Sequence, residues 1–252
     1  MSTTQRSTGV GRRFLDRLSI TGTVIEIEAI TPRMRRVRIG GDAVRGLGRV
    51  PGQQVRVHVG DLLSPRMWIR PGDLLRTYSV WWYDPAAGEL DLCVMDHGEG
   101  PGARWGRDLT VGQEVRFGRP EGRFTLRPDA PYHVFAGEET AAVAIGAMLA
   151  ALPADAAVYG AVETATPEDR LPLARGAELV LPLRGAASAA SSAVLLDAVR
   201  GLELPTEPGI AYVAGEAKTV QSIREHLVVD RGWPRRSVLT KPFWTPGKKG
   251  ME

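Results

Sequence analysis

A cation and an aromatic ring stand two residues apart in the segment 76–80, which reads Arg-Thr-Tyr-Ser-Val. The segment is typical of a β-strand, and the two-residue period of a strand places Arg76 and Tyr78 on one face. A guanidinium group beside a flat ring suits a ligand that combines a phosphate with a planar ring system. By itself, the pattern also fits an ordinary half-buried strand face.

A glycine-rich turn follows one hairpin later, over residues 97–105, which read His-Gly-Glu-Gly-Pro-Gly-Ala-Arg-Trp. Pro101 can occupy the first position of a helix, because a helix does not use the N–H group there. The backbone N–H groups of Gly102 and Ala103 would then be available to an anion such as a phosphate. A plain loop is the alternative, because glycine and proline mark loops in general.

The order and spacing of these two segments resemble those of the siderophore-interacting proteins, a family of FAD-containing ferric-siderophore reductases built on the ferredoxin-reductase plan. The resemblance extends to residues 137–140 (Gly-Glu-Glu-Thr), 213–216 (Val-Ala-Gly-Glu) and 241–247 (Lys-Pro-Phe-Trp-Thr-Pro-Gly). These segments occur in the order that the family shows, and together they span roughly residues 15–248.

Composition indicates a soluble globular protein of one large or two ordinary domains, with 252 residues, 43% hydrophobic and 24% charged. Cys93 is the single cysteine, which excludes an internal disulfide and any cysteine-based zinc or iron–sulfur site. The four histidines do not have a metal-ligand spacing. The first 13 residues lack the apolar run of a signal peptide, and the apolar stretch 140–152 is too short to cross a bilayer. We expect a monomeric, cytoplasmic protein without metal or membrane partners.

A cluster of arginines at positions 33, 35, 36 and 38 accompanies the net charge of +3. A strand over residues 34–39 would place Val37 and Ile39 on one face and Arg36 and Arg38 on the other, as in a common solvated strand. No aromatic residues are interleaved with these arginines. We therefore expect no nucleic-acid partner.

The first half of the chain alternates apolar and polar residues in short runs near 20–28, 34–39, 53–59, 74–83, 89–96 and 113–118. Roughly six short strands with glycine and proline turns between them predict an antiparallel barrel. We assign residues 1–18 to a flexible N-terminal arm, because they are polar and aperiodic, and 19–126 to the barrel. A short helix over 101–109 would lie across the barrel end.

The second half changes to an α/β pattern over residues 127–240. Strand, Gly-Glu turn and helix occur twice, after 132–136 and after 210–214. Strands near 157–162 and 178–181 and a helix near 190–200 complete a parallel sheet of roughly five strands, whose ligands would lie beyond the carboxyl ends. There is no Gly-x-Gly-x-x-Gly motif, so binding of NADPH or NADH to this domain is implied by the resemblance alone. The predicted fold class is thus a six-stranded FAD-binding β-barrel followed by a parallel α/β NAD(P)-binding domain.

The resemblance implies roles for three neighbouring residues. Arg76 would pair with the FAD pyrophosphate, Tyr78 would pack on the isoalloxazine ring, and Ser79 would form a hydrogen bond near the flavin N5 atom. Many relatives have threonine in place of Ser79, and the hydroxyl is retained. Strand alternation places Ser79 opposite Tyr78, so both reach one ring only if the strand ends or twists there.

The resemblance also implies a wider set of cofactor-binding residues. They are Thr77, His97, Gly100, Pro101, Gly102, Ala103, Trp105, Thr140, Gly215, Glu216, Phe243 and Trp244. Several have a structural alternative. His97 could cap a turn, Trp105 could pack in the core, Thr140 could be a helix cap, and Glu216 could contact the nicotinamide ribose or favour the positive end of its helix.

The tail 241–252 resembles a segment that folds back over the flavin, where a subset of relatives has Ser-Gly-Tyr-Trp. Lys241 adds a cation that could stabilise reduced, anionic flavin. We therefore predict Lys241 as a catalytic residue, together with Ser79, whose hydroxyl would form a hydrogen bond near the flavin N5 atom. Anionic catecholate or hydroxamate complexes of iron would be attracted by Arg66, Arg70, Lys248 and Lys249, and we assign Lys241 to the substrate site as well. Solvated surface charge explains Arg66, Arg70, Lys248 and Lys249 equally well.

A flavin in this position would take a hydride from NAD(P)H and pass single electrons to ferric iron. The predicted function is therefore reduction of ferric siderophores with release of Fe(II) in the cytoplasm. The alternatives are a flavin reductase of another acceptor and a non-catalytic siderophore- or flavin-binding protein. Arginines at 170, 175 and 184 lie where a 2′-phosphate of NADPH could bind, but the sequence does not decide between the two nucleotides, nor the class of siderophore.

Overall fold

The computed structural model describes residues 19–60 and 75–248. The expected N-terminal arm, 1–18, and the predicted substrate residues Arg66, Arg70 and Lys249 lie outside the described residues. Within the described part of the chain, no helix has the length and apolar character needed to span a membrane.

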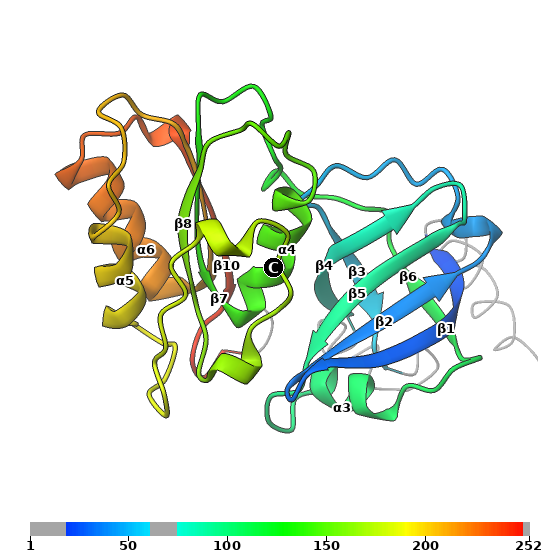
Figure 1. Cartoon of the computed structure of the whole chain (residues 1–252). Helices are drawn as coiled ribbons and strands as arrows, with labels where there is room; N and C mark the ends of the chain where they lie inside the picture. The colour runs from blue at the N-terminus through cyan, green and yellow to red at the C-terminus, as the bar shows by residue number, and fades with distance from the viewer. Residues whose placement is uncertain (1–18, 61–74, 249–252) are drawn as a thin grey trace, which may run out of the picture.

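The first half is a closed antiparallel barrel, as the alternation predicted (Figure 1). Its strands are β1 (Ile20–Thr31), β2 (Met34–Gly40), β3 (Gln54–His58), β4 (Leu75–Asp84), β5 (Glu89–Met95) and β6 (Glu114–Phe117). They follow the order β1-β2-β5-β4-β3-β6, and pairing of β1 with β6 closes the barrel. Closure leaves no unpaired strand edge, and every second side chain enters the core.

The faces of β2 match the expectation from its alternation. Val37 and Ile39 are fully buried in the barrel, whereas Arg36 and Arg38, which alternate with them, are only partly buried on its outer face. Arg36 pairs with Glu26 and Glu28 at 2.8 and 2.7 Å. Arg38 donates two hydrogen bonds to Asp91, at 2.7 and 2.9 Å. The arginine cluster at these two positions is therefore neutralised within the barrel wall.

Helix α3 (Pro101–Asp108) follows β5, close to the predicted position. Its buried side contains Ala103 and Gly106, and a Cβ atom on Gly106 would lie 2.6 Å from Val94. The helix therefore packs closely against β5. Arg35 donates to the carbonyl oxygens of Gly106 and Arg107 at 3.3 Å, which places a cation at the negative end of the helix.

The second half contains a parallel sheet with helices on both faces. The strands are β7 (His133–Glu138), β8 (Val158–Glu163), β9 (Ile210–Glu216) and β10 (Val238–Trp244), in the order β10-β9-β7-β8. The α-helices are α4 (Glu139–Leu149), α5 (Ala193–Arg200) and α6 (Ala217–Glu225). Short helical segments are η1 (Asp42–Val44), η3 (Pro167–Asp169), η4 (Gly176–Glu178), η5 (His226–Asp230) and η6 (Arg235–Ser237).

Two predictions about this sheet were wrong. The segment 178–181 does not form a fifth strand, because it makes only isolated bridges from Val180 to Ala161 and from Leu183 to Thr164. Pro182 lies between these bridges and has no N–H group for a regular ladder. Residues 241–244 are not a separate tail, because they form the end of β10 and pair with β9. Pro242 is tolerated there because β10 is an edge strand.

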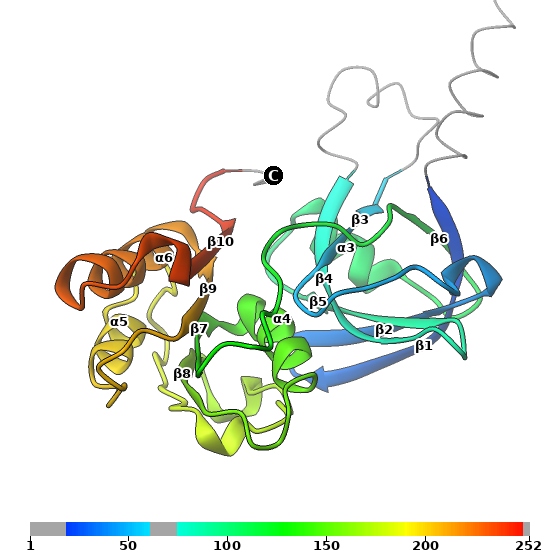
Figure 2. The same cartoon turned by 90° about the horizontal axis from the view of Figure 1, so that it is seen from above.

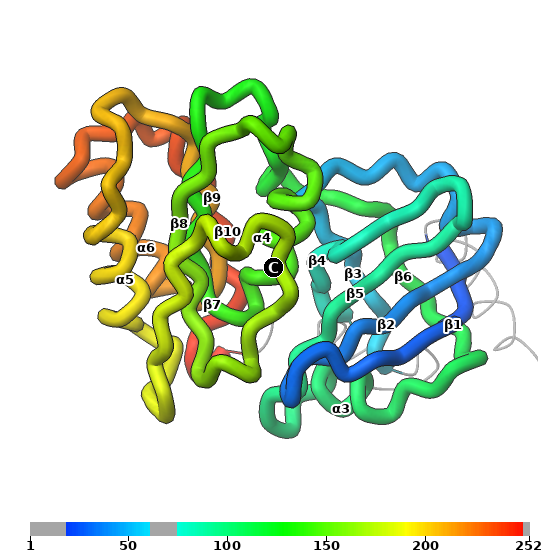
Figure 3. Tube along the Cα trace, in the orientation of Figure 1, coloured from blue at the N-terminus to red at the C-terminus, as the bar shows by residue number. Residues whose placement is uncertain are grey.

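Helix α4 lies between the parallel sheet and the barrel, whereas α5 and α6 cover the other face of the sheet (Figures 1 and 2). Ten of the eleven residues of α4 are buried, as expected for a helix with partners on both sides. A Cβ atom on Gly146 would lie 2.5 Å from the ring of Trp81 on β4, so glycine permits the close approach of the two halves. Figure 3 follows the chain from β6 to β7, where it passes from the barrel to the sheet.

Candidate functional site

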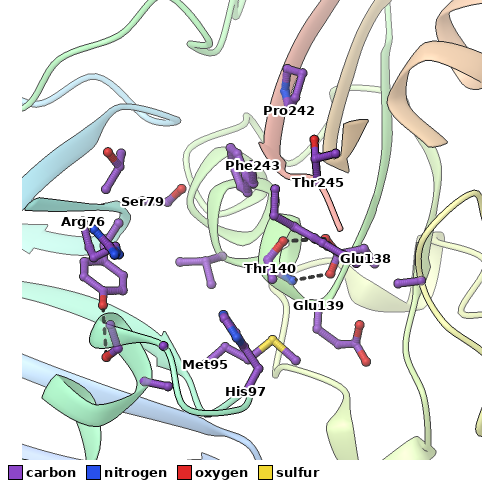
Figure 4. A pocket seen from close by; sticks show the side chains of 18 of the residues that line it. Arg76, Ser79, Met95, His97, Glu138, Glu139, Thr140, Pro242, Phe243 and Thr245 are labelled. Carbon is purple, nitrogen blue, oxygen red and sulfur yellow. Dashed lines mark hydrogen bonds between the residues drawn. The ribbon is translucent and has the colours of Figure 1, made fainter. Parts of the chain in front are cut away.

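A cavity of about 640 Å³ lies between the barrel and the parallel sheet. Strand β4 and the start of α3 form one wall, and the carboxyl ends of β7 and β10 with the start of α4 form the other. Figure 4 shows Arg76 and Ser79 on one side, Glu138 and Thr140 opposite them, and Phe243 between the two groups. Most of the predicted site residues line this cavity, namely Arg76, Thr77, Tyr78, Ser79, His97, Gly100, Pro101, Gly102, Ala103, Thr140, Lys241, Phe243, Trp244 and Lys248.

Tyr78 is held between the start of α3 and Trp105. Its hydroxyl donates to the carbonyl oxygen of Gly102 at 3.4 Å, and its ring stacks on Trp105 with centroids 5.4 Å apart. Burial raises the pKa of the Tyr78 phenol far above its ordinary value, so the hydroxyl remains a donor. Trp105 packs against the barrel core and is not among the cavity-lining residues, so the structure favours its core alternative over a contact with the adenine.

Consecutive residues of β4 line the cavity, although strand alternation alone would direct Tyr78 and Ser79 to opposite faces. A register shift in the pairing of β4 with β5 begins at Val80, directly after Ser79. Such bulges bend a strand and increase its twist. Residues 76–79 themselves pair with β3 in regular register, so the bulge marks the point directly after Ser79 where the regular strand is interrupted.

The start of α3 has unused hydrogen-bond donors. Gly100 is the N-cap, no side chain caps the helix, and Pro101 occupies the first turn. The backbone N–H groups of Gly102 and Ala103 belong to the first turn of the helix, where N–H groups have no partner within the helix. A Cβ atom on Gly102 would lie 2.8 Å from the Tyr78 hydroxyl and 3.4 Å from Arg76 Cγ. Free amides, a nearby guanidinium and a position without a side chain together fit the diphosphate of FAD.

Glu138 connects the elements of the opposite wall. It is 2% exposed, and its carboxylate accepts hydrogen bonds from the Thr140 N–H at 2.8 Å, from the Thr140 hydroxyl and from the Trp244 indole at 2.9 Å. Burial raises the pKa of Glu138, and these donors oppose that increase. The carboxylate thus caps α4 and holds the end of β10 against it. From the sequence, Glu138 was noted only as part of the Gly-Glu-Glu-Thr segment, and no role was predicted for it.

Glu139 and Arg184 form a buried ion pair at the edge of the cavity. Arg184 donates to Glu139 Oε1 and Oε2 at 2.7 and 2.8 Å and to Glu163 at 3.3 Å. Burial alone would raise the pKa of Glu139, but the hydrogen bonds from Arg184 and the charge of Arg184 bring it below its ordinary value. Because these carboxylates already engage it, Arg184 is poorly placed to bind a 2′-phosphate.

The two other arginines that sequence reasoning considered for a 2′-phosphate also have protein partners. Arg170 donates to the carbonyl oxygen of Leu181 at 2.9 Å. Arg175 pairs with Glu178 at 2.6 Å and donates to carbonyl oxygens that precede β8. Arg175 therefore lies at the amino end of that strand, opposite the edge where ligands of parallel sheets bind.

Gly215 and Glu216 do not line the cavity. Glu216 is 1% exposed and accepts hydrogen bonds from the N–H groups of Ser191, Lys218 and Thr219 at 2.9, 3.0 and 2.9 Å. Its carboxylate therefore caps α6, and the structure favours this alternative over a contact with the nicotinamide ribose. Gly215 has φ +122°, and a Cβ atom there would lie 2.8 Å from Glu138, so glycine is required for close packing.

The cations of the cavity differ in exposure. Lys241 is half-buried near the end of β10, whereas Lys248 is exposed. His97, in the turn before α3, is exposed as well. Among residues 19–60 and 75–248, no three His, Cys, Asp or Glu side chains gather in a way that could hold a metal ion.

Solved structures share the arrangement of a barrel followed by a parallel α/β half. The ferredoxin reductase in carbazole 1,9a-dioxygenase shares it, with a TM-score of 0.68, 19% identity and coverage of 90% of this chain and 69% of that one. A siderophore utilization protein from T. fusca gives a TM-score of 0.77 at 28% identity, covering 93% of this chain and 95% of that one.

Sequence comparison is more specific than the fold. Residues 23–124 match the siderophore-interacting FAD-binding domain, and residues 130–247 match the siderophore-interacting protein model. Ferric vibriobactin reductase ViuB of Vibrio cholerae is 29% identical over 198 residues, which are 77% of this chain and 72% of that protein. The chain belongs to the siderophore-interacting protein family, and its first half is an FAD-binding domain of that family.

Proposed function

We propose that this protein is an FAD-dependent NAD(P)H:ferric-siderophore oxidoreductase that releases Fe(II) in the cytoplasm. The observation that carries the proposal is the shared cavity. One wall presents free helix amides, Arg76 and Tyr78, and the other is built from the carboxyl ends of β7 and β10. Bound FAD would accept a hydride from the nucleotide and pass the two electrons singly to ferric iron.

On the barrel side, Arg76 and the amides of Gly102 and Ala103 bind the FAD diphosphate. The guanidinium charge and the positive end of α3 act together there. Tyr78 supports the flavin ring from a position that Trp105 fixes by stacking. The hydroxyl of Ser79 supplies a hydrogen bond to the ring. In this assignment, residues 19–126 form the FAD domain.

On the other side, residues 127–240 with the end of β10 bind the nicotinamide nucleotide near Thr140. The Thr140 hydroxyl donates to Glu138, so its oxygen keeps a lone pair for a ligand in the cavity. The aromatic pair Phe243 and Trp244 closes the cavity around the ring system. Hydride transfer requires both rings to lie in contact here, and the cavity is common to both halves.

Ferric siderophores approach through the side that carries Lys241 and Lys248. Both cations line the cavity, and anionic iron complexes are attracted to them at long range. From the sequence alone, we propose that Arg66 and Arg70 attract the same iron complexes. Ferric vibriobactin reductase, as its name states, reduces a ferric siderophore, and the identity of 29% supports the same reaction class here.

Anaerobic spectroscopy with the purified, FAD-loaded protein tests the proposal. We expect the flavin absorbance to bleach on addition of NADH or NADPH and to return on addition of a ferric siderophore, with Fe(II) trapped by ferrozine. Arg76→Met should lose FAD on gel filtration. Arg45→Met is the matched control, because Arg45 is 50% exposed, pairs with Asp42 and does not line the cavity.

Three outcomes contradict the proposal in different ways. A protein that takes up no FAD favours the alternative of a non-catalytic siderophore-binding protein. Flavin that bleaches but is not reoxidised by ferric siderophores indicates another electron acceptor. Flavin that is reduced by dithionite but by neither nucleotide indicates another electron donor.

A further inference from the structure

The hairpin between β1 and β2 reaches from the barrel into the α/β half through Arg33. Its Nε and Nη2 atoms donate to the two carboxylate oxygens of Asp169 at 2.9 and 3.0 Å. Nη2 also donates to Glu139 Oε1 at 2.8 Å. Asp169 ends η3, and Glu139 is the first residue of α4, so one guanidinium joins the barrel to two separate elements of the other half.

Both carboxylates also accept hydrogen bonds from groups within the α/β half. Asp169 is 7% exposed and accepts from the N–H and hydroxyl of Thr166 at 3.3 and 3.0 Å. Glu139 is 3% exposed and accepts from Arg184 and from the Ala165 N–H. The hydrogen bond from Arg33 is the main cause that lowers the pKa of Asp169, so this carboxylate stays ionised at neutral pH. The partner surface is therefore charged and held in place by groups of the α/β half itself.

The contact of Arg33 with Asp169 also favours one relative orientation of the two halves, which the apolar interface does not. The α4 surface meets the barrel through contacts such as Gly146 with Trp81, and apolar burial alone does not select one angle between two bodies. A planar guanidinium that binds one carboxylate with two parallel hydrogen bonds does select an angle. Arg33, Glu139 and Arg184 also line the cavity, so this contact sets the geometry at its edge.

We propose that Arg33 is a positioning residue that aligns the α/β half with the barrel for hydride transfer. This rests on the proposed function. In that step the C4–H bond of the nicotinamide breaks, and the hydride forms a bond to the flavin N5 atom. Both electrons move with it, so the nicotinamide is oxidised and the flavin is reduced. The reaction joins a group in one half to a group in the other, and small errors in such an alignment are costly.

The two half-reactions separate this role from general damage. In anaerobic stopped-flow experiments with FAD-loaded protein, Arg33→Met should slow flavin reduction by NADH or NADPH about tenfold to a hundredfold. After reduction by dithionite, reoxidation by a ferric siderophore should change by less than about twofold, because that step does not need the nucleotide aligned. Arg36→Met is the matched control, since Arg36 follows on the same hairpin and pairs with Glu26 and Glu28 on the outer face of the barrel.

A distance measurement tests the same role without flavin. Spin labels at Asp42→Cys and Asp197→Cys report on the two halves, because these side chains are 100% and 70% exposed. Cys93 is buried, and burial raises the pKa of its thiol, so it does not compete for label. The distance distribution should be narrow in the native chain and clearly broader with Arg33→Met. Asp169→Asn should reproduce both effects, and the double variant should be no worse than either single change.

Two results would overturn the inference while the proposed function stands. One is unchanged flavin reduction and an unchanged distance distribution in Arg33→Met. The other is equal slowing of both half-reactions with no change in distance, which indicates a local defect in the cavity. If neither nucleotide reduces the native protein, the proposed function fails, and this inference fails with it.

Discussion

The two halves of the molecule differ in whether a side chain caps the N-termini of their α-helices. On the barrel side, α3 has no side-chain cap, and its first residues line the cavity. On the other side, Glu138 caps α4, Ser192 caps α5 and Glu216 caps α6. An uncapped N-terminus can bind a phosphate, whereas a buried carboxylate at the same place occupies the donors and adds negative charge.

This difference assigns separate tasks to the two halves. The barrel side leaves backbone donors available to an anionic group. In the α/β half, the strand ends Glu138 and Glu216 face their own helices, and Glu163 pairs with Arg184. A nucleotide bound there must rely on ring contacts and side chains rather than on free helix ends. The comparison yields three predictions, from the largest expected effect to the smallest.

Closing the uncapped end should have the largest effect. Gly102→Leu would push against Tyr78 and Arg76 and cover the helix amides, so FAD affinity should fall about thirtyfold to a hundredfold, equivalent to about 2–3 kcal/mol. Isothermal titration of the apoprotein with FAD measures this. Gly118→Leu is the control, because the nearest atom to its Cβ is 4.0 Å away, and its affinity should not change. Equal affinity in the two variants would mean that FAD is bound elsewhere.

Removing a cap on the other side should affect stability instead. Glu216→Ala leaves the N–H groups of Ser191 and Thr219 unpaired and should lower the free energy of unfolding by about 1–3 kcal/mol, without loss of FAD affinity. Urea denaturation measures this, with exposed Glu225→Ala as control. Hydrogen bonds outweigh burial and lower the pKa of Glu216, so its contribution is present above the ordinary pKa of about 4.3 and is lost on acidification. A weaker FAD complex in Glu216→Ala would contradict the separation of tasks.

The smallest effect concerns a buried polar group with no partner. His133 lies at the start of β7, and neither ring nitrogen has a hydrogen-bond partner. Its ring stacks near Phe135 and Tyr212, with centroids 6.3 and 6.1 Å away. His133→Phe should therefore raise the free energy of unfolding by about 1 kcal/mol at pH 7.

The pH dependence sharpens this test. Burial, with a smaller contribution from Arg175, lowers the pKa of His133, so below about pH 6.5 the unfolded chain binds a proton that the native state does not. Stability of the native chain should fall as the pH drops through this range, and the loss should be smaller in His133→Phe. His226→Phe is a contrasting variant, because His226 bonds to Asp230 and Arg231, and it should be destabilised. An identical pH profile in His133→Phe would show that His133 finds a partner in solution.

Local pattern was enough to predict much of the molecule. Alternation in the first half predicted six strands, and the structure confirms them with small shifts of their ends. Pro101 and the glycines around it predicted a helix that begins at an open turn, and α3 begins there. The segments 76–80, 97–105 and 241–247 were expected at one site, and residues from all three line one cavity.

The misses arose where a residue has two possible partners. Glu216 was considered for a ribose contact, but two N–H groups of the helix it precedes and the N–H group of Ser191 donate to its carboxylate. Trp105 was predicted at the cofactor, but the barrel core and Tyr78 take up its ring. Residues 241–244 were assigned to a tail because they resemble a segment that folds back over the flavin, yet they pair with β9 as the end of an edge strand, where Pro242 is tolerated.

The sequence by itself determined which residues alternate, where helices begin and which segments carry donors and rings, because these depend on neighbours a few positions apart. Only the tertiary structure decided which buried carboxylates cap helices, that β10 joins the sheet, and that Arg33 meets Asp169 across 136 positions of the chain. Periodicity states which face of an element a side chain occupies. The partner on that face depends on how distant elements pack, and no local pattern records it.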